Sequence, residues 1–412
     1  MMFNTLDNQP MAFITNDHGG VLTGGHREVL YQNQIPDFVP EWLGKCYGSL
    51  YGVLPALHAL EHQATQGIYT YVRQAATGNS AYSTIVLMFR RAGRSACVLN
   101  EGLHLDRASI DTFCAHVFES MPDVMQVDFH AIAPLTAIPL ESTLPRQARP
   151  CLSWPCTEDI VLYLPDSADT YLGRLGKATR KSMKKTLSRA RRELTNFSHR
   201  IVSGAALDDN LVHHIVAMNH ARMAAQGRDS ALDENATLEL IKLIRSHGEA
   251  GVIVNGTQLC AGTLACRFGG DVFSLVNAHD PAFDHLGLGN LCRHLMILQA
   301  IKAGAKRFHL MGGNWAAKRA TLAERQPLHH VTVYRSRRAV LTDLTGLARH
   351  AGRASVFHLR YWLEDQLVSA PMGWIARAIG ALRKYRRRHA SRSAAIVVER
   401  ETHAVSHTAS RS

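Results

Sequence analysis

Residues 284–290, Asp-His-Leu-Gly-Leu-Gly-Asn, have the composition of a phosphate-binding loop. Glycine lacks the Cβ atom that would keep an anionic ligand away from the backbone. We expect a helix from Asn290 to Ala303, whose N-terminus would offer unpaired N–H groups and the positive end of its dipole. Two glycines before a helix can equally form a tight turn without a ligand, so the surrounding residues must decide between the two interpretations.

Four polar residues near this loop are candidates for the chemistry of a group transfer. His279 and Asp280 end the strand that should precede the loop, and either could serve as general base. Asn277 lies on the same strand and could orient a substrate. Lys318 could hold a phosphate or an acidic group, although it could also be an ordinary surface lysine.

The elements that must position these residues follow from hydrophobic periodicity and turn signals. The hairpin of strands 251–255 and 258–268 is marked by Asn255-Gly256. We expect further strands at 159–164, 272–278, 307–311 and 331–336, and helices at 168–194, 208–225, 235–247 and 290–303.

An earlier block has the same outline of helix, strands, helix and strand, which indicates two α/β domains in tandem. Its helices are expected at 50–63 and 107–120, and its strands at 68–73, 84–90, 95–100 and 124–132. We therefore divide the chain into a poorly ordered lead-in, an N-terminal domain ending in a proline-rich linker, a C-terminal domain with the loop, and a basic helical tail. Their ranges are 1–40, 41–157, 158–343 and 344–412.

Several motifs in residues 159–335 resemble the GNAT-like acetyltransferase family of the CelD (cellulose biosynthesis) type, which is related to the Fem-type aminoacyl transferases. The stretch from Tyr171 to Lys185 resembles the opening basic helix of that family, and the hairpin with its Asn-Gly turn resembles its paired strands. Asp280-Pro281 followed by Gly289-Asn-Leu, and Phe308 to Lys318, are similar to its two later motifs.

Together with the repeated outline of elements, this resemblance predicts two tandem GNAT-like domains with mixed, mostly antiparallel sheets flanked by helices. It implies an acyltransferase that uses acetyl-CoA or another acyl-CoA, with no metal, and acts on a polysaccharide or cell-envelope precursor. The catalytic candidates are His279, Asp280 and Lys318. Asn277 and Asn314 are candidates for binding the acceptor. The residues expected to bind the phosphates of the cofactor are Leu286, Gly287, Leu288, Gly289 and Asn290.

Three residues depart from the family pattern. Asp284 stands where Gln or Arg is common, His309 where Asp is frequent, and Ala317 where Tyr is frequent. The acceptor chemistry is therefore open. Two alternatives remain: an aminoacyl-tRNA-dependent transferase of the Fem type, and a non-catalytic module that binds an anionic polymer.

The net charge of +12 is concentrated in the tail. Residues 335–412 contain 15 Lys/Arg and 5 Asp/Glu, so they hold ten of these charges. Within the tail, residues 374–389 combine an apolar face with arginines, which suits either packing on the body or peripheral contact with an anionic membrane. The eight scattered cysteines and the absence of a signal sequence favour the cytoplasm, with peripheral contact at the inner membrane face as an option.

Two further motifs have simple explanations. His58 and His62 form an H-x-x-E-H pattern, which readily arises by chance in a chain with 23 histidines, so we expect no zinc site. The basic helix around residues 171–194 carries nine Lys/Arg and one acidic residue. Its charges are either a solvated face or an electrostatic landing site for an anionic acceptor. The absence of interleaved aromatic residues speaks against single-stranded nucleic acid.

Overall fold

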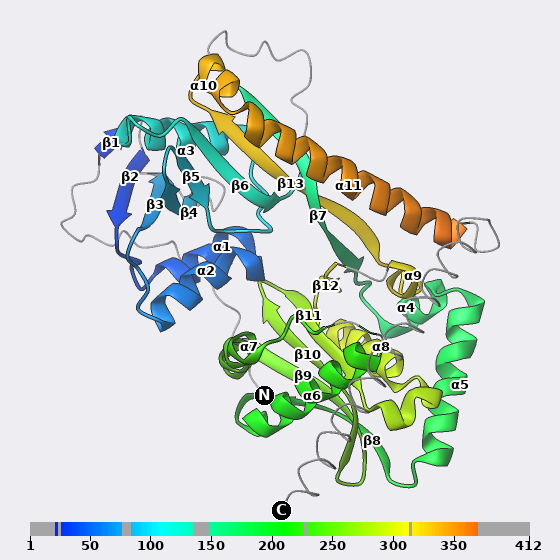
Figure 1. Cartoon of the computed structure of the whole chain (residues 1–412). Coiled ribbons are helices and arrows are strands. Elements are labelled where there is room, and N and C mark those ends of the chain that lie inside the picture. Colours follow the sequence, from blue (N-terminus) through cyan, green and yellow to red (C-terminus); the bar gives the residue numbers. More distant parts are fainter. Residues whose placement is uncertain are drawn as a thin grey trace, which may run out of the picture. The chain divides into compact units, whose positions relative to one another are not determined.

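The computed structural model describes residues 21–23, 26–75, 84–135, 149–225, 227, 229–312 and 315–369. The chain forms two compact units (Figure 1). The first unit comprises Met1–Val161, Arg267–Phe273 and Glu324–Phe357, and the second comprises Leu162–Cys266, Ser274–Ala323 and His358–Ser412. The expected α/β class is confirmed in both.

The first unit is built on strands in the order β1-β2-β3-β4-β5-β6-β13-β7. Its strands are β1 Val21–Thr23, β2 His26–Gln32, β3 Ile68–Ala75, β4 Ile85–Ala92, β5 Ser95–Val98, β6 Gln126–Ile132, β7 Cys151–Tyr163 and β13 Glu324–Tyr334. Its helices are α1 Val39–Tyr47, α2 Leu50–Glu61, α3 Arg107–Ser120, α10 Arg337–Thr342 and the start of α11 Leu344–Ser369. The sheet is mixed, because β5 pairs with β6 in parallel, whereas the pairs β2–β3, β3–β4 and β4–β5 are antiparallel.

The second unit contains strands in the order β12-β11-β10-β9-β8. These are β8 Phe197–Ser203, β9 Gly248–Asn255, β10 Gln258–Phe268, β11 Asp271–His279 and β12 Arg307–His309. Its helices are α4 Ala168–Arg174, α5 Lys177–Glu193, η2 Gly204–Ala206, α6 Asp209–Ala225, α7 Glu234–His247, η3 Pro281–Leu286, α8 Leu288–Lys302 and α9 Trp315–Arg319.

The two units repeat one order of elements, as the sequence predicted in outline. A strand, two helices, three strands, a helix and a strand follow one another in both. They run from β2 to β6 in the first unit and from β8 to β12 in the second, and the five strands lie in matching order in their sheets.

Four expected boundaries differ from the structure. Residues 26–32 of the supposed lead-in form β2, which pairs with β3. The supposed linker includes the start of β7, and a register shift in its pairing with β13 occurs opposite Pro155. Strand β13 belongs to the first unit, because it pairs with β6 and β7. The single helix expected at 168–194 is broken into α4 and α5 at Leu175 and Gly176.

The strands that support the loop are covered on both faces. A Cβ on Gly251 of β9 would collide with Met296 of α8, and a Cβ on Gly262 of β10 would collide with Ile215 of α6. These glycines therefore let α8 and α6 pack directly on the sheet. The hairpin loop itself consists of Gly256, whose φ is +62°, and Thr257, so glycine supplies the positive φ that the turn needs.

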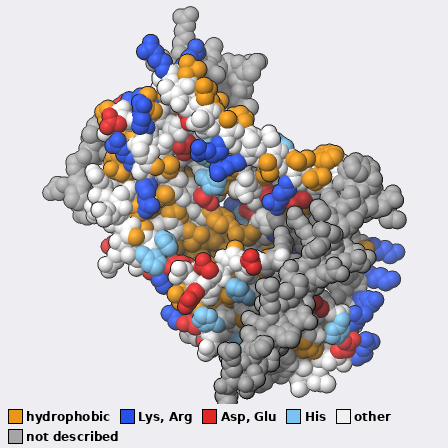
Figure 2. All heavy atoms as spheres, viewed as in Figure 1, with side chains coloured by type: hydrophobic (Ala, Val, Ile, Leu, Met, Phe, Trp, Pro, Cys, Tyr) orange, Lys and Arg blue, Asp and Glu red, His pale blue; other side chains and the backbone are white. Residues whose placement is uncertain are grey.

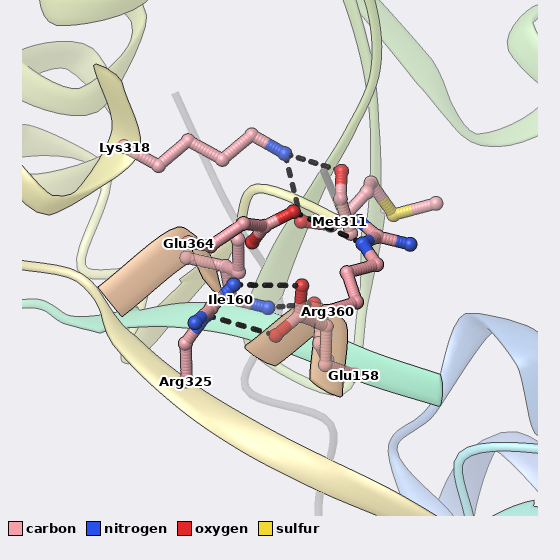
Figure 3. Close-up of polar contacts among 9 residues, drawn as sticks. Glu158, Ile160, Met311, Lys318, Arg325, Arg360 and Glu364 are labelled. Carbon is pink, nitrogen blue, oxygen red and sulfur yellow. Dashed lines mark hydrogen bonds and ion pairs between the residues drawn. The ribbon is translucent and has the colours of Figure 1, made fainter. Parts of the chain in front are cut away.

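A buried ion pair links β13 to β7 in the first unit. Arg325 Nε lies 2.9 Å from Glu158 Oε2, and the side chains are 5% and 7% exposed (Figure 3). Among the described residues, no helix is both long and apolar enough to cross a membrane. The tail segment 374–389 lies outside the described residues.

Candidate functional site

The candidate loop lies between β11 and α8 in the second unit. Asp280 follows β11 and caps η3, since its Oδ1 accepts a hydrogen bond of 2.9 Å from the N–H of Ala282. Gly287 then ends η3 and begins α8 in the left-handed conformation, with φ +64° and ψ +34°. Its N–H donates to the carbonyl of Asp284 at 3.2 Å. The expected strand-to-helix turn is thus made by a short 3-10 helix and one left-handed glycine.

The first turn of α8 offers free backbone donors. Within the described part of the chain, no acceptor is found for the N–H groups of Leu288, Gly289 or Asn290. Nothing lies within 4 Å of the position that a Cβ on Gly287 would occupy. Open space above Gly287 and unpaired N–H groups at a helix N-terminus are the features that an anionic group needs in order to bind.

Gly289 has a different role from Gly287. A Cβ at this position would lie 2.9 Å from His279 Nδ1 and 3.4 Å from Asn277 Oδ1. The Asn277 side-chain amide also donates to the carbonyl of Gly289 at 3.2 Å. Gly289 therefore lets the two polar side chains of β11 pack directly on α8, which brings both predicted residues to the loop.

His279 is paired with the acidic residue that opens the loop. His279 Nε2 lies 2.6 Å from Asp284 Oδ1, with side-chain exposures of 20% and 69%. An uncompensated carboxylate here would repel an anionic ligand. The contact gives the Asp284 carboxylate a hydrogen-bonding partner, and it gives the imidazole an orienting partner.

Leu286 and Leu288 contribute to the loop by anchoring it. Both side chains are buried, at 2% and 0% exposure, in a cluster with Ile253, Leu291 and Cys292. Any contact that they make with a ligand would therefore come from their backbone. The predicted site residues from Asn277 to Asn290 are brought together around one turn.

Lys318 is held by the chain segment after β12. Its ammonium donates to the carbonyls of Leu310, Met311 and Gly312 at 2.6, 2.8 and 2.7 Å. Figure 3 shows Lys318 directed at the Met311 carbonyl. Met311 has a φ of +64°, which is unusual for a residue other than glycine. Lys318 thus fixes a strained turn, and Asn314 lies outside the described residues.

His309 and Ala317, where the sequence departs from the family pattern, lie on neighbouring elements. His309 ends β12 and is 7% exposed. Ala317 lies on α9 and is partly buried. The H-x-x-E-H histidines lie in the first unit, where the rings of His58 and His62 are 4.6 Å apart and exposed.

A buried polar pair on α4 and α8 was not found from the sequence. Tyr171 Oη lies 3.5 Å from His294 Nδ1 and 3.5 Å from the carbonyl of Thr321. Burial, followed by the charge of Arg293, lowers the pKa of His294 to about 4, so this imidazole is neutral at neutral pH. Burial also raises the pKa of Tyr171. The available signal was the apolar spacing of Leu291, His294 and Ile297 on α8.

A family match with known proteins covers the loop and its supporting elements. Residues 180–319 match the acetyltransferase (GNAT) domain family, and this stretch contains the loop, β8 to β12 and α6 to α8. The expectation of a GNAT domain is confirmed over these residues, and the CelD-type subgroup stays a prediction. No curated protein matches the chain in sequence.

Three solved structures are distantly similar to the chain. FemX is 10% identical over 74% of this chain and 96% of its own, with a TM-score of 0.49. L-PGS from Bacillus licheniformis is 11% identical over 78% and 98%, with a TM-score of 0.46. A tandem GNAT protein from the clavulanic acid biosynthesis pathway is 12% identical over 75% and 98%, with a TM-score of 0.37. These similarities are too distant to assign a substrate.

Proposed function

We propose that the second unit is an acyl-CoA-dependent N- or O-acyltransferase whose loop at residues 284–290 binds the phosphates of the donor. The observation that carries this proposal is the N-terminus of α8. Its free N–H groups and the open space above Gly287 lie within the stretch that matches the GNAT domain. Acetyl-CoA is the first donor to test.

The reaction requires a nucleophile, a base and a leaving group. The acceptor nitrogen or oxygen attacks the thioester carbonyl carbon, its proton passes to a base, the carbon–sulfur bond breaks, and the sulfur leaves as a thiolate that takes the proton back from the base to become a thiol. We assign the base to His279, because Asp284 orients its imidazole. Asp280 is the weaker candidate, since one of its carboxylate oxygens already caps η3. Asn277, packed beside His279, is assigned to substrate positioning.

We assign the acceptor to polysaccharide or cell-envelope precursors, and the reaction to the cytoplasm. The family resemblance of the motifs supports the first assignment, and the eight free cysteines suit a reducing compartment. The role of Asn314 as an acceptor contact and that of Lys318 in catalysis belong to the same proposal. For Lys318 this would require its ammonium to release main-chain carbonyls.

Calorimetry with the full-length protein tests the donor assignment. We expect saturable heat with acetyl-CoA or a longer acyl-CoA, and at least tenfold weaker binding of S-acetylpantetheine, which lacks the phosphates. The Gly287→Asn variant tests the loop itself. Asn tolerates the left-handed backbone, and its side chain would fill the open space above residue 287 where the phosphates are proposed to bind. Absence of heat with every acyl-CoA would overturn the proposal.

The same preparation separates the alternatives. Retention of aminoacyl-tRNA at moderate salt, without CoA binding, would favour a Fem-type transferase. Binding of an anionic polymer without CoA binding and without release of a thiol from any donor would favour the non-catalytic module. Thiol release from acetyl-CoA that depends on an added amine or alcohol would support the acyltransferase.

A further inference from the structure

Helix α5 of the second unit carries a row of basic side chains on one face. Six exposed cations recur at helical spacing along its 17 residues: Lys177, Lys181, Lys184, Lys185, Arg191 and Arg192. At about 100° per residue they lie within an arc of about 120°, and at 1.5 Å per residue the row is about 22 Å long. Figure 2 shows Lys and Arg side chains projecting along the edge where Figure 1 places α5.

The row contains no acidic residue. Glu193 is the sole acid of α5, and it lies on another side, where it approaches His285 Nε2 at 3.1 Å and Arg189 Nε at 3.9 Å. Of the six cations, Arg192 contacts Glu193 at 3.3 Å. Within the described ranges, the other five have no ion pair with a carboxylate. Their charge is therefore available to a partner.

The opposite face of α5 is fixed to the second unit. Ala190 is buried and Leu187 packs in the cluster beneath the candidate loop. On the two flanks of the row, Arg189 donates to the carbonyl of His285 at 3.0 Å, and Arg180 donates to the carbonyl of Gly173 at 2.9 Å. Because these contacts fix the orientation of the helix, its apolar residues stay packed and a partner can contact only the basic face.

We propose that α5 docks the second unit on the headgroups of an anionic lipid bilayer. Side chains on one face of a straight helix reach the same height, so a flat charged surface engages the whole row, and each basic residue adds to the attraction. The two cations that flank the row, Arg180 and Arg189, already bind main-chain carbonyls, so the unengaged charge lies on one face and not on the two flanks that would meet the walls of a nucleic-acid groove. Four of the six cations are lysines, which suit a diffuse surface charge better than bidentate phosphate recognition.

Vesicle co-sedimentation of the full-length protein tests this surface. The α5 variant carries Lys→Gln at 177, 181, 184 and 185. The matched control removes four exposed cations elsewhere in the second unit: Arg200, Lys302, Lys306 and Arg319. We expect at least tenfold weaker binding of the α5 variant to phosphatidylglycerol-containing vesicles, and less than a threefold change for the control. Binding to phosphatidylcholine vesicles should be weak for all proteins.

Three outcomes would overturn the proposal: no binding of the wild type to anionic vesicles, equal loss in both variants, or no loss in the α5 variant. The last would assign binding to another surface, such as the basic tail. A 30-base-pair duplex at 150 mM salt is the second probe. If the α5 variant lost duplex binding while vesicle binding persisted, the row would be a nucleic-acid surface. Matching circular dichroism and thermal unfolding would confirm that both variants are folded.

Discussion

His279 Nε2 lies 2.6 Å from Asp284 Oδ1, so the acidic residue that opens the candidate loop is paired with the imidazole that ends β11. From the sequence alone, an acidic residue at position 284 is unfavourable for a loop that binds phosphate. The contact gives the carboxylate a hydrogen-bonding partner, and Asp284 in turn holds His279 in one orientation. A single contact thus joins the two functions proposed for the site, binding of a phosphate and removal of a proton.

Substitutions of this pair should change donor affinity in opposite directions. Asp284→Asn removes a negative charge beside the α8 N-terminus, and acyl-CoA affinity should rise about two- to fivefold. His279→Gln removes the imidazole that holds the carboxylate, which can then approach the donor phosphates, and affinity should fall by a similar factor. Calorimetry on the single and double variants forms a double-mutant cycle. Equal affinities in all four proteins would show that the pair does not face the donor.

Substitution of the two loop glycines by alanine should harm the protein in different ways. Gly287→Ala places a Cβ on a residue with φ +64°, and we expect a loss of about 1–2 kcal/mol in unfolding free energy. Gly289→Ala favours the helix but brings a Cβ within 2.9 Å of His279 Nδ1, so it should displace the imidazole and lower turnover more than stability. Urea denaturation and acyl-transfer rates check both. Unchanged turnover of the Gly289→Ala protein would show that His279 takes no part in the reaction.

Lys318 should contribute to stability through Met311. Lys318→Met leaves three main-chain carbonyls without their donor, and we expect a loss of about 2 kcal/mol in unfolding free energy. Met311→Gly in that background should recover part of the loss, because glycine adopts the positive φ without strain. If Lys318 acted in catalysis instead, Lys318→Met would lower kcat with an unchanged urea midpoint.

Much of this site follows from local sequence. The loop, the helix after it and the hairpin before it have strong local signals: glycines at a turn, helical spacing, and an Asn-Gly step. Gly256 and Gly287 have the positive φ values that such signals predict. Asn277 and His279 were predicted near the loop because the strand on which they lie precedes it. Since they are two residues apart on that strand, their side chains share one face.

The remaining features depend on contacts between distant segments. Strand β13 begins at Glu324, in the polar stretch Glu-Arg-Gln-Pro-Leu-His-His, which has no strand-like pattern. It is a strand because β6 and β7 pair with it on either side, and Arg325 finds Glu158 only in that pairing. Pro150 and Pro155 indicated a linker. In the structure, however, Pro155 lies within β7, where a register shift in the pairing with β13 accommodates it. Pairing across more than 160 residues has no local signal.

His294 should make folding sensitive to acid. Burial lowers its pKa from 6.5 to about 4, so the unfolded chain binds more protons at this residue between those two values. The contribution of His294 to stability is complete above about pH 6.5 and is lost as the pH falls toward 4, by up to roughly 3 kcal/mol. His294→Leu removes the titrating group and keeps an apolar side chain beside Tyr171, so its unfolding free energy should fall less over this range. Urea denaturation of both proteins from pH 7.5 to 4.5 measures the difference. A constant difference across that range would mean that His294 remains protonatable in the folded protein.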